Sequence, residues 1–228
     1  MTTSPAAPVS IDDSLPPHAP GADEKFTLRE LSHEEAPFWY HAYSRKPPHV
    51  ANTALTFNRG WGLTRFAPIQ AADGTTLHTY YAATTREGAY LESVLHDMVL
   101  GSPGFFDKSL LDTQHLAKIR LQSPLKFASF HSHDLPALKL TRRQLIDSLP
   151  ADYEHTRPWA QAALIQCPDA AAIGYTSRRN DAARCLMLIE QRLPVPPFEL
   201  VEDRCIGADP VLRREVLDLV ASLGFSTL

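Results

Sequence analysis

The sequence predicts an α+β fold in a single domain that follows a disordered N-terminal tail. The chain has 228 residues, of which 44% are hydrophobic and 21% charged, as in ordinary globular proteins. A chain of this size buries roughly 70% of the surface that it exposes when unfolded, so it needs no disulfide or metal for stability. Strand and helix patterns both occur after residue 25, and nothing there resembles a linker or a repeat.

The predicted tail covers residues 1–24. This segment contains five prolines and four acidic residues, and it has no lysine or arginine. Such a composition offers little apolar surface to offset the entropy of ordering, so we expect disorder. The rest of the chain carries equal numbers of acidic and basic side chains.

Residues 77–83 predict a strand, because they are rich in aromatic and β-branched side chains. A helix follows directly. Residues 84–87 fit a capping box that begins at Thr84, and apolar side chains then recur at helical spacing as far as Met98. This helix would place Glu92 and His96 four residues apart on one face.

The C-terminal half predicts two further helices and two strands. One helix would start near Thr156, with Pro158 in its first turn, where a missing N–H costs nothing. Residues 172–176 and 186–189 have strand patterns on either side of a charged turn. Residues 209–224 begin with Asp-Pro and end with glycine, which favours a final amphipathic helix.

Composition excludes several function classes. The balanced charge of the folded part does not favour a nucleic-acid or membrane surface. No apolar run reaches the roughly 18 residues of a membrane span. The N-terminus lacks the pattern of a secretory signal, so we expect a cytoplasmic protein.

Motif searches exclude several common chemistries. No phosphate-binding glycine loop, dinucleotide fingerprint, zinc-protease motif or serine-hydrolase elbow occurs. The three cysteines form no CxxC pair, which disfavours a disulfide framework or a zinc ribbon. The His-x-His pattern at 131–133 lacks a third ligand at a diagnostic spacing, so we expect no metal.

Four residues become informative through their surroundings, although each alone is unremarkable: Arg65, Tyr81, Glu92 and Ser177. Several motifs in order resemble the RES domain family, which is named for an Arg, a Glu and a Ser. They cover about residues 38–192, and Ser177 stands at the family's serine position. The motifs are FNRGWGLTRFAPI (57–69), LHTYYAATTREGAYLESVLHD (77–97), YEHTRPWAQA (153–162), AIGYTSRRN (172–180) and CLMLIEQR (185–192).

The resemblance implies a RES domain over residues 25–228 with a C-terminal helical extension. It implies a fold similar to the diphtheria-toxin type of ADP-ribosyltransferase, with a mixed β-sheet core and flanking helices. It also implies an enzyme that breaks the nicotinamide–ribose bond of NAD. Many members are toxins of toxin–antitoxin pairs. Some use phosphate as the acceptor, and others transfer ADP-ribose to a protein.

This chemistry suits the residue types that the resemblance singles out. Cleavage develops positive charge at the ribose, which a carboxylate such as Glu92 would stabilise. Arg65, with Arg178 as a second candidate, would bind the pyrophosphate through forked donors. Tyr81 would present its ring to the nicotinamide, and Ser177 would orient the substrate by hydrogen bonding.

One departure from the family concerns an early strand. Members usually carry an arginine where this chain has Trp-Tyr-His-Ala at 39–42. Either His41 takes over its contact with NAD, or Arg45 reaches in, or the site is weakened. Asn58 is a further candidate for NAD binding, through bracing the glycine loop at 60–62.

His96 has two interpretations: it hydrogen-bonds Glu92 from one turn further along, or it only packs the helix. NAD is expected as substrate rather than cofactor, with phosphate as a candidate co-substrate. Two alternatives stay open, namely a protein ADP-ribosyltransferase and a degenerate RES-like module that binds nucleotide or a partner. If the protein is a toxin, we expect an antitoxin or immunity-type protein to block its cleft. A secreted effector is an alternative to a toxin–antitoxin pair. An oligomer is also compatible with the sequence.

Overall fold

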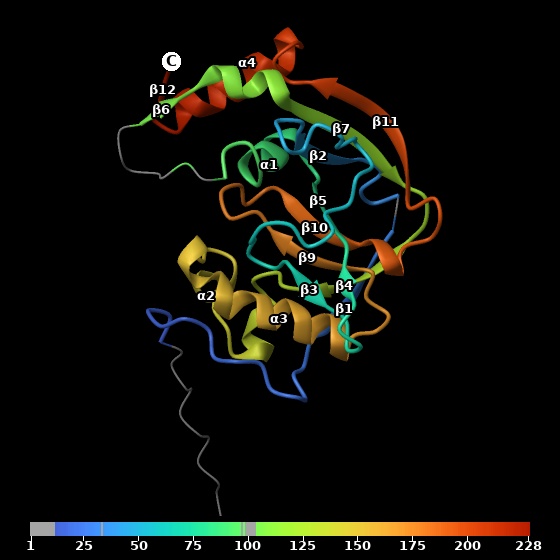
Figure 1. Ribbon diagram of the computed structural model, residues 1–228. Coiled ribbons are helices and arrows are strands. Elements are labelled where there is room, and N and C mark those ends of the chain that lie inside the picture. The colour runs from blue at the N-terminus through green and yellow to red at the C-terminus, as the bar shows by residue number, and fades with distance from the viewer. Residues whose placement is uncertain (1–11, 33, 97, 99–103) are drawn as a thin grey trace, which may run out of the picture.

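The computed structural model describes residues 12–228 apart from 33, 97 and 99–103, and its centre is a mixed eight-stranded sheet (Figure 1). The strand order is β1-β8-β9-β10-β5-β2-β7-β11. Only the β8–β9 pair in this sheet is parallel, because α2 and α3 lie in the crossover between them. The strands are β1 (Thr27–Leu31), β2 (Trp39–Ser44), β5 (Thr79–Ala83), β7 (Gln114–Leu121), β8 (Leu125–Ser129), β9 (Ala172–Thr176), β10 (Arg184–Ile189) and β11 (Phe198–Cys205).

Helices and two small sheets complete the α+β class that the sequence predicts. The helices are α1 (Arg86–Leu91), α2 (Arg142–Leu145), α3 (Tyr153–Gln166) and α4 (Pro210–Ser222). Short 3-10 turns are η1 (Lys108–Thr113), η2 (Leu135–Leu138), η3 (Pro150–Asp152) and η4 (Glu190–Arg192). The small sheets pair β3 (Ile69–Gln70) with β4 (Thr76–Leu77), and β6 (Phe105–Phe106) with β12 (Ser226–Thr227).

The two faces of the large sheet have separate cores, because successive side chains of a strand point to opposite faces. On one face, Tyr81 and Ala83 of β5 pack in a cluster that also contains side chains of α1, α3 and α4. On the other face, Tyr80 and Ala82 join a smaller cluster around Trp39. In Figure 1, α1 and α4 lie toward one end of the sheet, and α2 and α3 toward the other.

The predicted strands at 172–176 and 186–189 are confirmed, the second as part of β10. The final helix is also confirmed. Its N-cap Asp209 accepts hydrogen bonds from the N–H groups of Val211 and Leu212, and Gly224 follows its end with a φ of +84°.

Both predicted boundaries of α1 are wrong. Thr85, not Thr84, caps α1, because the Thr84 hydroxyl instead accepts a hydrogen bond from the backbone N–H of Arg184. The helix ends at Leu91, well before Met98, and Glu92 is its C-cap.

The α3 helix begins at Tyr153 rather than near Thr156, so Pro158 lies inside it and not in its first turn. The proline that does occupy a first turn is Pro150, in the preceding η3. Because η3 leads directly into α3, the helix begins three residues before the start that the sequence pattern indicated.

Within the predicted tail, the structure describes residues 12–24 as a segment without helix or strand that lies against the body, and we name it the N-terminal strap. The Trp159 indole donates to the carbonyl of His18 over 2.7 Å, and the Gln166 amide donates to that of Gly21 over 3.0 Å. Disorder was predicted from the side chains of the tail alone. The hydrogen-bond donors that hold the strap belong to α3, so the composition of the tail does not reveal them. Residues 1–11 lie outside the described residues.

None of the described helices is both long and apolar enough to cross a membrane. The three cysteines are free thiols. Cys185 is buried, whereas Cys167 and Cys205 are partly buried, as expected of small hydrophobic side chains.

Candidate functional site

A cavity of about 310 Å³ opens on the helix-covered face of the sheet. Its walls come from the loop before β3, from β5, from the turn after α1 and from the start of α3. Three of the four residues that the sequence singles out line this cavity. The lining residues are Leu63, Thr64, Arg65, Tyr81, Glu92, Ser93, His96, Pro150, Tyr153 and Tyr175.

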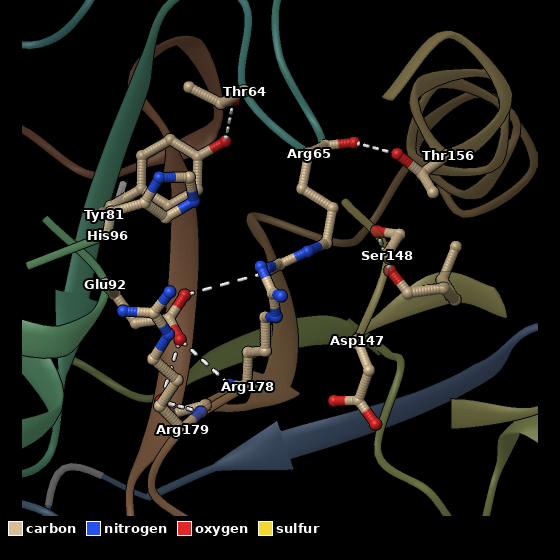
Figure 2. Close-up of polar contacts among 12 residues, drawn as sticks. Thr64, Arg65, Tyr81, Glu92, His96, Asp147, Ser148, Thr156, Arg178 and Arg179 are labelled. Carbon is tan, nitrogen blue, oxygen red and sulfur yellow. Dashed lines mark hydrogen bonds and ion pairs between the residues drawn. The ribbon is translucent and has the colours of Figure 1, made fainter. Parts of the chain in front are cut away.

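Glu92 is held at both carboxylate oxygens (Figure 2). Its Oε1 accepts hydrogen bonds from the Ser177 hydroxyl over 2.7 Å and from the backbone N–H of Arg178 over 2.9 Å. Its Oε2 faces Nη1 of Arg65 at 3.6 Å. Since the helix ends one residue earlier, the carboxylate is fixed by partners from other elements rather than by α1.

Arg65 is a buried cation with unused donors. Its side chain is 5% exposed, and within the described structure its Nε and Nη2 atoms have no hydrogen-bond partner. Burial acts to lower the pKa of the guanidinium, but the Glu92 carboxylate raises it, and the net shift is upward. Thr156 of α3 fixes the backbone by donating to the Arg65 carbonyl over 2.5 Å. Two donor nitrogens of a charged side chain, Nε and Nη2, therefore remain for an acceptor.

Tyr81 lines the cavity from β5. Its hydroxyl shares a hydrogen bond of 2.7 Å with the hydroxyl of Thr64, which also accepts from the N–H of Ala67. Burial raises the pKa of the phenol, so its hydroxyl stays protonated at neutral pH. The ring is thus held at its outer end by the loop that carries Arg65 (Figure 2).

The structure brings Ser177 to the site, but not to the cavity surface. Ser177 is completely buried, and its hydroxyl donates to Glu92. The hydrogen bond that the structure gives this hydroxyl therefore goes to the carboxylate, and the expected bond to a substrate stays a prediction. Arg178 supports the same oxygen through its backbone. Arg179 donates to the carbonyls of Leu95 and Met98 and so anchors the turn after α1.

Two other candidates, His41 and Arg45, lie away from the cavity. His41 points to the opposite face of the sheet, where its ring packs on Tyr80 with centroids 4.0 Å apart. Its neighbours on the strand, Tyr40 and Ala42, face the helices. Because side chains alternate along a strand, His41 must face the other side of the sheet. Arg45 is exposed just after the end of β2.

Asn58 braces the glycine loop, as expected, but does not line the cavity. Its side-chain oxygen accepts from the N–H groups of Gly60 and Trp61, and its amide donates to the Trp61 carbonyl. Gly60 and Gly62 have φ values of +99° and +71°, a conformation that favours glycine.

His96 lines the cavity, and its Nε2 lies 3.0 Å from the hydroxyl of Tyr153. The expected helical pairing with Glu92 fails because α1 ends before either residue.

Several residues in or beside the cavity were not predicted. Thr64, Tyr153 and Tyr175 occur inside the motifs at 57–69, 153–162 and 172–180, so the motifs contained a signal for them. Tyr40 lines a small adjoining cavity of about 20 Å³ together with Tyr81 and Glu92. Tyr40 and His41 are neighbours on one strand and therefore face opposite sides of the sheet, and this alternation could have indicated that Tyr40 faces the cavity.

Across the described part of the chain, no three His, Cys, Asp or Glu side chains come close enough together to hold a metal ion. The His-x-His pair at 131–133 instead stacks ring against ring, with centroids 6.1 Å apart.

One comparison with known proteins shows the family of this chain, and another shows a similar fold. The family model of the RES domain matches residues 29–205. No curated protein sequence matches the chain. The fold is similar to that of a chain in the crystal structure of the M. tuberculosis MbcT–MbcA toxin–antitoxin complex. The TM-score is 0.57 and the sequence identity 14%, over 82% of this chain and 90% of that chain.

Proposed function

Because this chain belongs to the RES domain family, we propose that it is a toxin that consumes NAD by cleaving the bond between nicotinamide and ribose. Phosphate is the proposed acceptor, with water as a less efficient one. The fold is then of the diphtheria-toxin ADP-ribosyltransferase type, as the sequence resemblance implies.

The observation that carries this proposal is the ion pair between buried Arg65 and largely buried Glu92 in one cavity. Buried charges are costly unless they are paired and hydrogen-bonded. Glu92 meets that condition, whereas two nitrogens of the Arg65 guanidinium, Nε and Nη2, have no hydrogen-bond partner in the described structure. A ligand that brings negatively charged oxygen to Arg65 and positive charge to Glu92 fits this arrangement. The pyrophosphate and the developing ribosyl cation of NAD supply the two charges.

The reaction needs no proton on its leaving group. The C1′–N bond of the nicotinamide ribose breaks, its electron pair neutralises the nicotinamide nitrogen, and an oxygen of phosphate forms the new bond to C1′. Glu92 stabilises the positive charge on the ribose as it develops. Tyr81 offers its ring to the nicotinamide, and Arg65 binds phosphate oxygens. Ser177 and the backbone of Arg178 position Glu92.

The test is nicotinamide release from NAD by the purified protein, with and without phosphate, for the wild type and for Glu92→Gln. The substitution keeps the size of the side chain and removes the negative charge, so we expect release to fall about 100-fold or more. Glu87→Gln is the matched control, because Glu87 lies on the same helix outside the cavity and should leave release unchanged.

Each other outcome selects a different function. Release that requires a protein acceptor would indicate ADP-ribosyl transfer. A melting temperature that rises with NAD, without any release, would indicate a binding module. Equal release by wild type and Glu92→Gln would remove Glu92 from the reaction.

A toxin that degrades NAD in the cytoplasm requires a partner that restrains it, and the similar fold comes from a toxin–antitoxin complex. We therefore propose that an antitoxin covers this cavity. Expression of the wild type should stop bacterial growth, Glu92→Gln should not, and co-expression of the protein encoded by the adjoining gene should restore growth. Continued growth with the wild type alone would contradict the toxin proposal.

A further inference from the structure

The side chain of His41 reaches the candidate site through the backbone of Tyr81, although it lies on the other face of the sheet. Its Nδ1 is 2.7 Å from the Tyr81 carbonyl oxygen. The imidazole contacts two tyrosine rings, with centroids 4.0 Å from Tyr80 and 5.6 Å from Tyr43. These contacts fix the ring in one orientation.

The sheet has a local break at this position. The β2 strand pairs with β7 along its whole length, from Trp39 to Ser44, but it pairs with β5 only at Tyr40 and Ala83. Beyond that position, β2 no longer offers a regular ladder of backbone donors to β5. A buried carbonyl needs a donor, and at Tyr81 the His41 side chain provides it.

The charge state of His41 supports a fixed role. Burial of the ring lowers its pKa to about 4, although the bond to Tyr81 and the nearby Asp203 carboxylate act in the opposite direction. The ring is therefore neutral at pH 7. Because a carbonyl oxygen only accepts, the single proton lies on Nδ1, and the imidazole donates it to Tyr81.

From this geometry we infer that His41 is a positioning residue, which sets the place of the Tyr81 ring in the cavity by holding the β5 backbone from behind. Thr64 holds the other end of the same residue at its hydroxyl. Tyr81 is thus clamped at its carbonyl and at its phenol. The role of Tyr81 in catalysis rests on the proposed function. The two hydrogen bonds that hold Tyr81, which we call the clamp, do not depend on it.

The first experiment needs no activity. Tyrosines labelled with ¹³C are observed by NMR in the full chain, and Tyr81 is assigned from the signal lost in Tyr81→Phe. His41→Phe keeps a ring in the stack and removes the donor, so the Tyr81 signal should shift. His41→Asn offers an amide donor near the Nδ1 position and should return the signal toward that of the wild type. Tyr43→Phe, which keeps the stack, is the control and should leave the signal in place.

The second experiment measures nicotinamide release in a double-mutant cycle. We expect His41→Phe to lower kcat about tenfold in the wild-type background and less than twofold in Tyr81→Ala, because no ring remains to be positioned. His41→Asn should retain most of the wild-type kcat.

Two results would overturn the inference. The first is a Tyr81 signal that His41→Phe leaves unmoved, and the second is an equal loss of kcat in both backgrounds. If the wild type releases no nicotinamide, the proposed function fails, and the NMR signal alone decides whether the clamp exists.

Discussion

Single hydrogen bonds decide which side chains of this site can act on a substrate. Ser177 is the clearest case, because its hydroxyl is completely buried and bonds the Glu92 carboxylate. Hydrogen bonds to charged groups contribute about 1.5–3 kcal/mol, and each ~1.4 kcal/mol corresponds to a factor of ten in rate. We therefore expect Ser177→Ala to lower kcat roughly 10- to 100-fold.

The Michaelis constant separates this role from substrate binding. If Ser177 acts only through Glu92, the KM for NAD in Ser177→Ala should stay within about twofold of the wild type, because interactions made only in the transition state change kcat. Steady-state kinetics of nicotinamide release provide both constants. A large rise in KM with unchanged kcat would instead assign Ser177 to direct substrate contact.

The sequence motifs alone predict that Arg65, Tyr81 and Glu92 share one site, because their order along the chain resembles a family. The same motifs did not indicate which partners the side chains of Ser177 and His41 have in the folded chain. The partner of Ser177 lies 85 residues away, and the side of the sheet that His41 faces depends on strand parity and on the break between β2 and β5. A partner distant in sequence and the pairing of two strands depend on the folded structure, so sequence motifs do not report them.

At the scale of elements, α1 delivers Glu92 and depends on its neighbours for its place. Glu215 of α4 accepts a hydrogen bond from the Tyr90 hydroxyl over 3.2 Å and pairs with Arg86 over 2.8 Å. Sequence periodicity predicted both helices, but it overestimated the length of α1. Periodicity cannot report that the chain turns after Leu91, where tertiary contacts hold Glu92.

The contacts between α4 and α1 lead to a prediction for Glu215→Gln. The ion pair is partly exposed, with 39% and 32% of the side chains accessible, so its loss should lower the free energy of unfolding by no more than about 1 kcal/mol. The kcat for nicotinamide release should fall severalfold, because α1 loses an anchor near Glu92. Urea unfolding and kinetics provide the two values.

The matched control for this prediction is Asp218→Asn. Asp218 pairs with Arg214 on the same helix, at the surface, and its substitution should change neither value. Equal losses of kcat in both variants would show that α4 supports α1 without a specific role for Glu215.

At the scale of the whole molecule, the N-terminal strap tests how far composition alone predicts disorder. Residues 12–24 precede the matched family domain and lie against α3, where the His18 ring packs edge-on against Trp159 with centroids 5.0 Å apart. The prolines of the strap restrict its unfolded states, so ordering costs less entropy than for a flexible segment. The strap can therefore bind to hydrogen-bond donors of α3 even though it has few apolar side chains of its own.

Deletion of residues 1–24 should therefore lower the melting temperature. Loss of the strap's hydrogen bonds and of the cover over Trp159 amounts to about 1–3 kcal/mol, which for a chain of this size corresponds to roughly 2–12 °C. Deletion of residues 1–11 alone is the control: subtracting its shift in a calorimetric scan from that of the longer deletion isolates the contribution of residues 12–24. Identical melting of the full chain and the longer deletion would show that the strap does not stabilise the body, and composition would then have predicted its behaviour better than the contacts do.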